Sequence, residues 1–158
     1  MSTASMGTRA EAAAAVNERL QRARGLRVEL QEAMSRLELA LAHPASPIGW
    51  AQVVEMYLYE LRAALDAHID AAEGPDGLLA EIRDQTPRLA PAAATLGHEH
   101  IDLLAMWDQA AGALRADPED TAGIRRRITT LLCELALHRQ RGADLVYDAY
   151  NVDIGDAN

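Results

Sequence analysis

The chain has 158 residues and a net charge of −9 at pH 7, and 49% of its residues are hydrophobic. This length and balance predict one globular domain with a sizeable core. The acidic charge argues against a nucleic-acid partner, because phosphate contacts need a basic surface. A single cysteine excludes an internal disulfide and a cysteine-based metal cluster. Without a signal peptide or an apolar run of about 20 residues, the expected location is the cytoplasm, with no membrane partner.

Apolar residues recur at helical spacing along most of the chain, and no long segment alternates with a period of two. The first ten residues are small and polar, and we expect them to be flexible. Cap and turn signals divide the rest: Ser46 before Pro47, Gly74 before Pro75, and an aspartate cap with Pro118 at the first helical position. The predicted helices cover residues 11–42, 48–73, 91–116 and 119–150, with a short helical turn at 76–82 and an acidic tail at 151–158.

Four long helices with mostly short connections predict an all-α fold, an up-down-up-down four-helix bundle over residues 11–150. No serine or cysteine has a credible catalytic triad around it. The sequence also lacks a glycine-rich phosphate loop. These observations favour a binding or structural protein over an enzyme.

Three of the predicted helices each carry one histidine in the row of residues that should face the core. The rows are Leu58–Leu61–Leu65–His68, Leu96–His100–Leu103–Trp107 and Leu131–Leu135–His138. A buried imidazole costs free energy unless it finds a partner, and in an antiparallel bundle these three fall at similar depth. The sequence therefore predicts that the three rings meet near one end of the bundle, and a metal ion is the simplest partner that all three could share. His43 and His98 should lie on the surface.

Carboxylates near the three histidines are candidates for completing such a site. Glu134 lies four residues before His138 and so shares its face of the helix. Glu73 is five residues after His68 and Asp144 is six residues after His138, so each should point to the flank and reach a metal only where the helix loosens. The predicted metal ligands are His68, His100, His138, Glu73, Glu134 and Asp144.

The order of these residues resembles the hemerythrin-like (HHE cation-binding) domain over about residues 52–150. The resemblance rests on His68 followed by Glu73, a Leu78-Leu79 loop helix, Glu99-His100, and His138 followed by Asp144. The segment from His138 to Gly155 also looks like the C-terminal signature of small bacterial members. The resemblance implies a four-helix bundle with a non-haem di-iron site, associated with oxygen binding, with sensing of oxygen or nitric oxide, and with peroxide handling.

Three departures from the family pattern imply a reduced site. The first predicted helix has no histidine, and in the third the positions four residues before and after His100 are Leu96 and Leu104, where the family has a second histidine. Glu73 and Asp144 match the family's carboxylates in order but are one residue out of register. The resemblance therefore implies about one bound ion or fewer, rather than two.

Two functions follow from the sequence. The first is a hemerythrin-like metal-binding protein that holds iron, zinc or manganese and leaves a coordination position open for oxygen, nitric oxide or peroxide. The alternative is a metal-free helical module, structural or protein-binding, in which the histidines form a hydrogen-bonded polar layer with Arg27 and Asp144. The sequence leaves both open and identifies no protein partner.

Overall fold

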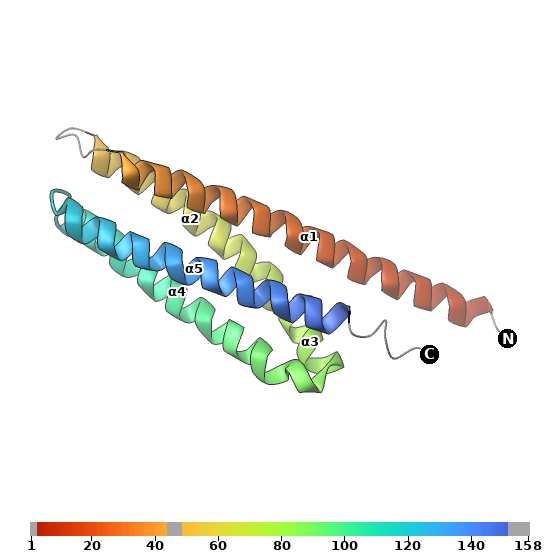
Figure 1. Cartoon of the computed structure of the whole chain (residues 1–158). Coiled ribbons are helices and arrows are strands. Elements are labelled where there is room, and N and C mark those ends of the chain that lie inside the picture. The colour runs from red at the N-terminus through yellow and green to blue at the C-terminus, as the bar shows by residue number, and fades with distance from the viewer. Residues whose placement is uncertain (1–2, 44–48, 152–158) are drawn as a thin grey trace.

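The computed structural model describes residues 3–43 and 49–151, with side chains from Gly7 onward, and these residues contain helices and turns but no strand (Figure 1). A short 3₁₀ turn, η1 (Pro87–Leu89), precedes the fourth α-helix. The α-helices are α1 (Thr3–Ala42), α2 (Trp50–Glu73), α3 (Leu78–Gln85), α4 (Ala90–Ala116) and α5 (Thr121–Tyr150).

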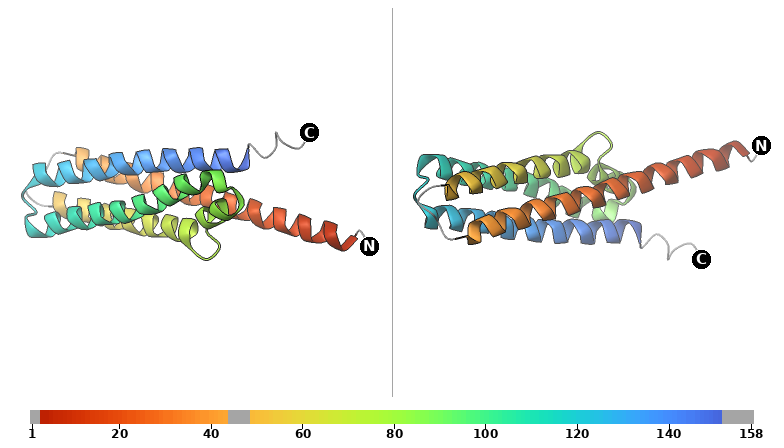
Figure 2. Two further views of the ribbon diagram at one scale, coloured as in Figure 1. Left: turned by 90° about the horizontal axis from the view of Figure 1, so that it is seen from below. Right: turned by 90° about the horizontal axis from the view of Figure 1, so that it is seen from above.

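The four long helices form an elongated bundle, as the sequence predicts. Helix α1 packs along α2, and α4 packs along α5 (Figures 1 and 2). The α4–α5 turn lies at one end of the bundle, whereas α3 and η1 lie at the other end, between α2 and α4. The N-terminal part of α1 extends beyond the other helices (Figure 2). Within the described part of the chain, no helix is long and apolar enough to cross a membrane.

Two helix starts differ from the expectation. Helix α1 begins at Thr3, so most of the first ten residues are helical where we expected an irregular segment. The alanine-rich run that follows has the highest helix propensity, and helix formation extends readily from it.

Helix α5 is capped by Asp120, whose carboxylate accepts a hydrogen bond of 2.9 Å from the Gly123 N–H. The predicted cap, with Pro118 inside the helix, is wrong, because Pro118 lies in the turn before Asp120. Ser46 and Pro47 lie outside the described residues, as does the tail beyond residue 151.

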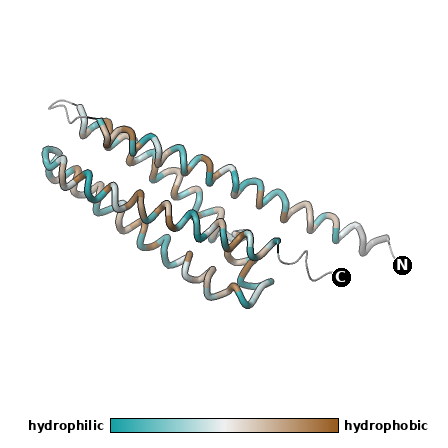
Figure 3. Tube along the Cα trace, in the orientation of Figure 1, coloured by the Kyte–Doolittle hydropathy of each residue, from teal (hydrophilic) through white to brown (hydrophobic). Residues whose placement is uncertain are grey.

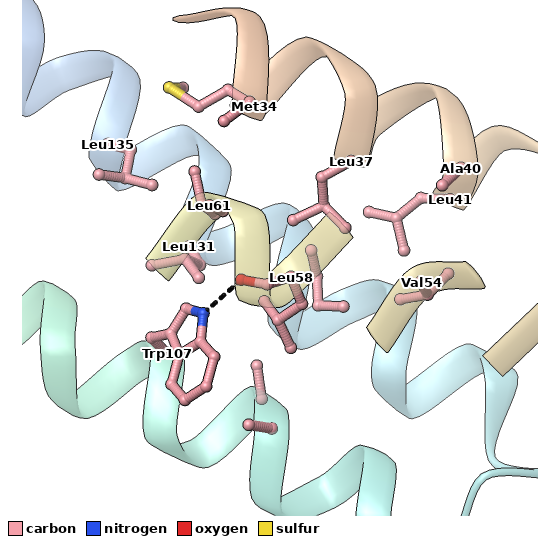
Figure 4. Close-up of a cluster of buried hydrophobic side chains, with 14 of the residues drawn as sticks. Met34, Leu37, Ala40, Leu41, Val54, Leu58, Leu61, Trp107, Leu131 and Leu135 are labelled. Atoms are coloured by element: carbon pink, nitrogen blue, oxygen red, sulfur yellow. Dashed lines mark hydrogen bonds between the residues drawn. The ribbon is translucent and has the colours of Figure 1, made fainter. Parts of the chain in front are cut away.

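Apolar and polar residues alternate in short stretches along the long helices (Figure 3), and the buried apolar residues build the core. Its larger cluster draws on α1, α2, α4 and α5 (Figure 4). Both tryptophans satisfy their indole N–H groups there. Trp107 donates to the Leu58 carbonyl at 2.8 Å, and Trp50 donates to the Ala40 carbonyl at 3.2 Å.

A smaller apolar cluster closes the end of the bundle that contains α3. Its buried members are Leu79, Ile82, Ala93, Leu96, Leu145 and Ala149. Along α4, His100 falls between Leu96 of this cluster and Leu103 of the larger one. Along α5, His138 falls in the same way between Leu135 and Leu145. The two histidines therefore form a polar layer within the core, with an apolar cluster on each side of it.

Candidate metal centre

The structure brings together the three histidines that the apolar rows pointed to. His68 comes from α2, His100 from α4 and His138 from α5. His100 and His138 are each only 2% exposed, and His68 is half-buried. His43 and His98 are exposed, as expected, and the His98 Nδ1 donates to the Ala94 carbonyl one turn earlier in α4.

The three rings surround one point. Their centroids are 5.5 Å apart for His68 and His100, 5.4 Å for His68 and His138, and 4.7 Å for His100 and His138. One nitrogen from each ring can be chosen so that all three lie within 4.8 Å of one another. The Nε2 atoms of His68 and His138 are 3.2 Å apart. Two nitrogens that bind one tetrahedral zinc at about 2.1 Å are separated by roughly 3.4 Å, so this pair already has the spacing of a shared ion.

Two carboxylates fix the orientation of the buried rings. The Nδ1–H of His100 donates to Glu73 Oε1, across from α4 to α2. The Nδ1–H of His138 donates to Glu99 Oε2 at 2.7 Å, across from α5 to α4. A neutral imidazole that donates from Nδ1 keeps its lone pair on Nε2. Each Nε2 lone pair faces the cluster and could bind an ion there, and a carboxylate behind each ligating histidine is the usual support of a metal site.

Glu99 is held in place by a second partner. Its other oxygen, Oε1, accepts from Arg141 Nε at 2.8 Å. Burial raises the pKa of the Glu99 carboxyl, but the hydrogen bonds from His138 and Arg141 outweigh it and leave the pKa below its ordinary value. Glu99 is therefore a carboxylate at neutral pH and a stable acceptor for His138.

One buried ring nitrogen among the three histidines has no hydrogen-bond partner. The short contact between His68 and His138 can satisfy both of their Nε2 atoms, because one ring donates and the other accepts. The Nε2 of His100 is buried and has no hydrogen-bond partner. A buried polar atom without a partner is uncommon and costs about 1–3 kcal/mol. The protein's own groups therefore do not satisfy all the buried nitrogens of the three histidines.

The surroundings of His68 and His138 favour the neutral form of each ring. Burial lowers the pKa of the His68 imidazole to about 3, and the nearby His138, His100, Arg27 and Arg139 act in the same direction. Burial also lowers the pKa of His138, although the Glu99 hydrogen bond opposes it. Neutral imidazole is the form that binds metal, so the environment keeps these two rings in that form.

The three carboxylates that we expected as metal ligands do not lie at ligand positions. Glu73 supports His100 through its Nδ1, which is the role of a partner behind a ligand. Glu134 is exposed, because the i,i+4 step turns about 40° around the helix and carries it to the edge of the buried row. Asp144 is exposed as well and accepts from the Gln140 side chain at 2.9 Å. The structure therefore places neither Glu134 nor Asp144 with the three histidines.

Glu99 is the residue that the sequence did not assign to the site. It precedes His100 by one position, so it lies about 100° around α4 from the core-facing row. That flank faces α5, where His138 and Arg141 bind it. The adjacency of Glu99 and His100 in the sequence was the available signal.

A cavity of about 60 Å³ opens beside the rings. All three histidines line it, and α1 contributes Ala23, Leu26 and Arg27. The middle of α1 thus borders the histidine cluster and contributes no histidine to it. The remaining lining is aliphatic apart from Arg139 of α5. An ion held by the rings would have this space on its open side.

The comparisons with known proteins give no relative. No protein-family model, no curated protein and no solved structure matches the chain.

Proposed function

We propose that this protein binds one transition-metal ion through the Nε2 atoms of His68, His100 and His138. The observation that carries the proposal is the buried, unpartnered Nε2 of His100, which lies with the other two rings in one cluster. In metal-free protein the lone pair of this nitrogen has no donor. An ion at the centre of the cluster gives it a partner.

The support behind the rings favours the same function. Glu73 and Glu99 fix the Nδ1–H tautomer of His100 and His138 and add electron density to each ring. Three imidazoles and an open position are a common arrangement for zinc. Imidazole also suits iron, and geometry and supply rather than affinity select the metal in such sites. Iron or zinc is therefore the expected occupant, and manganese is less favoured because neither Glu73 nor Glu99 would bind the ion directly.

The alternating up-down course of the four long helices is consistent with the hemerythrin-like resemblance. We propose that the chain is a reduced version of that design. Its two supporting carboxylates lie behind the rings and therefore do not bridge two ions. The cavity on the open side of the site is suited to a ligand of a few atoms, such as oxygen, nitric oxide or peroxide.

A metal-free polar layer is the second candidate. The 3.2 Å contact between the Nε2 atoms of His68 and His138 favours it, because these two rings can satisfy each other without an ion. It leaves His100 Nε2 unexplained. The version of this layer that includes Asp144 is not supported, because Asp144 is exposed and bound to Gln140.

Metal analysis of the purified chain decides between the two. The protein is loaded with iron(II) under anaerobic conditions or with zinc(II), freed of excess metal and analysed by mass spectrometry. We expect about one ion per chain. The His100→Ala variant should lose it, and the His98→Ala variant, which changes an exposed ring of the same helix, should keep it. Equal metal content in the two variants would show that His100 is not a ligand, and no metal in the parent would favour the metal-free layer.

A further inference from the structure

Two arginines beside the histidine cavity have no acidic partner. Arg27 of α1 and Arg139 of α5 both line the cavity and are half-buried. Among the described residues, neither forms a salt bridge, although the chain has 24 acidic and 15 basic residues. Because acidic side chains outnumber basic ones in this protein, two neighbouring guanidinium groups without a carboxylate partner indicate a binding site for an anion from solution.

The two side chains lie close enough to affect each other. Burial lowers the pKa of Arg27, and the charges of Arg24 and Arg139 lower it further. Arg24, Arg27 and Arg139 together line a second hollow between α1 and α5, so Arg27 and Arg139 border both spaces. Like charges held together in this way repel, and a bound anion relieves the repulsion.

The hydrogen bonds of Arg139 are incomplete. One terminal nitrogen donates to the Gln31 side chain, but its Nε is buried and has no partner. Arg27 forms no hydrogen bond through its side chain within the described part of the chain. A guanidinium presents parallel N–H groups that match the two oxygens of a planar oxyanion. The free Nε–H of Arg139 is therefore a donor available to such a ligand.

The cavity sets the size of the ligand. The cavity volume of about 60 Å³ suits a ligand of a few heavy atoms. Away from the three histidines and two arginines its wall is aliphatic, with Leu26, Leu79 and Val146 among the lining residues. A methyl group fits such a wall, whereas a second charge does not.

We propose that Arg27 and Arg139 bind a small carboxylate, of the size of formate or acetate, at the mouth of the histidine cavity. The carboxylate oxygens accept from the two guanidinium groups, and the short apolar end lies against the aliphatic wall. This site uses no metal ligand. It goes beyond the proposed metal function and does not depend on it.

The test uses the metal-free full-length chain in chloride-free buffer, so that its result is independent of metal binding. Acetate is titrated into the protein and followed by calorimetry and by the arginine Nε–H signals in NMR spectra. We expect saturable binding of one acetate per chain. Acetamide, which has the same shape without the charge, and benzoate, which exceeds the cavity, should not bind.

Two variants and two matched controls locate the site. Arg27→Gln and Arg139→Gln should each weaken acetate binding about tenfold, because each removes a charged hydrogen-bond donor. Arg22→Gln and Arg126→Gln remove the same charge from exposed positions of α1 and α5 and should leave the affinity unchanged. Equal effects of the four variants would overturn the proposal. The proposal would also be overturned if the parent chain bound acetamide or benzoate as tightly as acetate. This comparison uses the parent chain alone, so it holds even where a variant does not fold.

Discussion

At the scale of single residues, the environment of the histidines determines how the protein responds to acid. His68 and His138 have folded-state pKa values below the ordinary 6.5, about 3 for His68, because burial disfavours their charged forms. Below about pH 6.5 the unfolded chain therefore binds more protons at these two positions than the folded chain does, and for His68 this difference extends to about pH 3. In metal-free protein, the stability that depends on these two neutral rings should be fully present above about pH 6.5. As the pH drops further, the free energy of unfolding should decrease by up to about 1.4 kcal/mol per pH unit for each ring.

Urea unfolding at a series of pH values measures this dependence. His68→Gln removes one of the two groups and should reduce the slope, whereas His98→Gln, at an exposed position, should not. Identical slopes for the parent and the His68→Gln variant would show that the ring is not held neutral by burial.

Glu99 provides a second prediction at this scale. Replacing it by Gln keeps an acceptor for the Nδ1–H of His138 but removes the charge that supports the ring. We expect metal affinity to fall about 10- to 100-fold, as with other partners behind ligating histidines. Competition with a zinc-binding dye measures the affinity. Glu134→Gln, a change of the same kind on the exposed side of α5, is the control and should have no effect. A larger loss for Glu134 than for Glu99 would contradict the arrangement described above.

At the scale of the helices, the start of α5 depends on one side chain. The Asp120 carboxylate accepts from the Gly123 N–H at 2.9 Å and satisfies one of the free donors of the first turn. Asp120→Ala should lower the free energy of unfolding by about 1 kcal/mol. Glu119→Ala, which changes the neighbouring acidic residue, should cost much less, and chemical denaturation compares the two. A larger effect at Glu119 would place the cap elsewhere.

At the scale of the whole molecule, metal should stabilise the fold as a unit, since the ligands come from three helices that are separated in the unfolded chain. An ion at a free concentration 100 times its dissociation constant adds about 2.7 kcal/mol. For a chain of this length that corresponds to a rise in Tm of roughly 5–10 °C. Scanning calorimetry with and without zinc measures the rise, and the His100→Ala variant should show none. The same rise in that variant would mean that zinc acts elsewhere.

The sequence predicted the helical bundle and the meeting of the three histidines because both depend on helical periodicity alone. Rows such as Leu96–His100–Leu103 face the core whatever the details of packing. The carboxylates were harder to assign because their positions depend on how neighbouring helices approach each other. Glu99 reaches His138 only because α4 and α5 lie side by side, and Asp144 is one residue beyond the face that could reach the rings. The cap at Asp120 was missed because Pro118 is equally compatible with a turn.

The histidine layer also determines how the helices are aligned along the bundle axis. Aliphatic rows by themselves tolerate a slide of one helix by a turn, because one leucine then replaces another. His68 and His138 can satisfy each other only when α2 and α5 are aligned as they are. A shift of one turn would bring each ring against an aliphatic side chain and break the bonds of Glu73 and Glu99. The layer thus fixes the register of the helices, as a single buried asparagine does in a coiled coil.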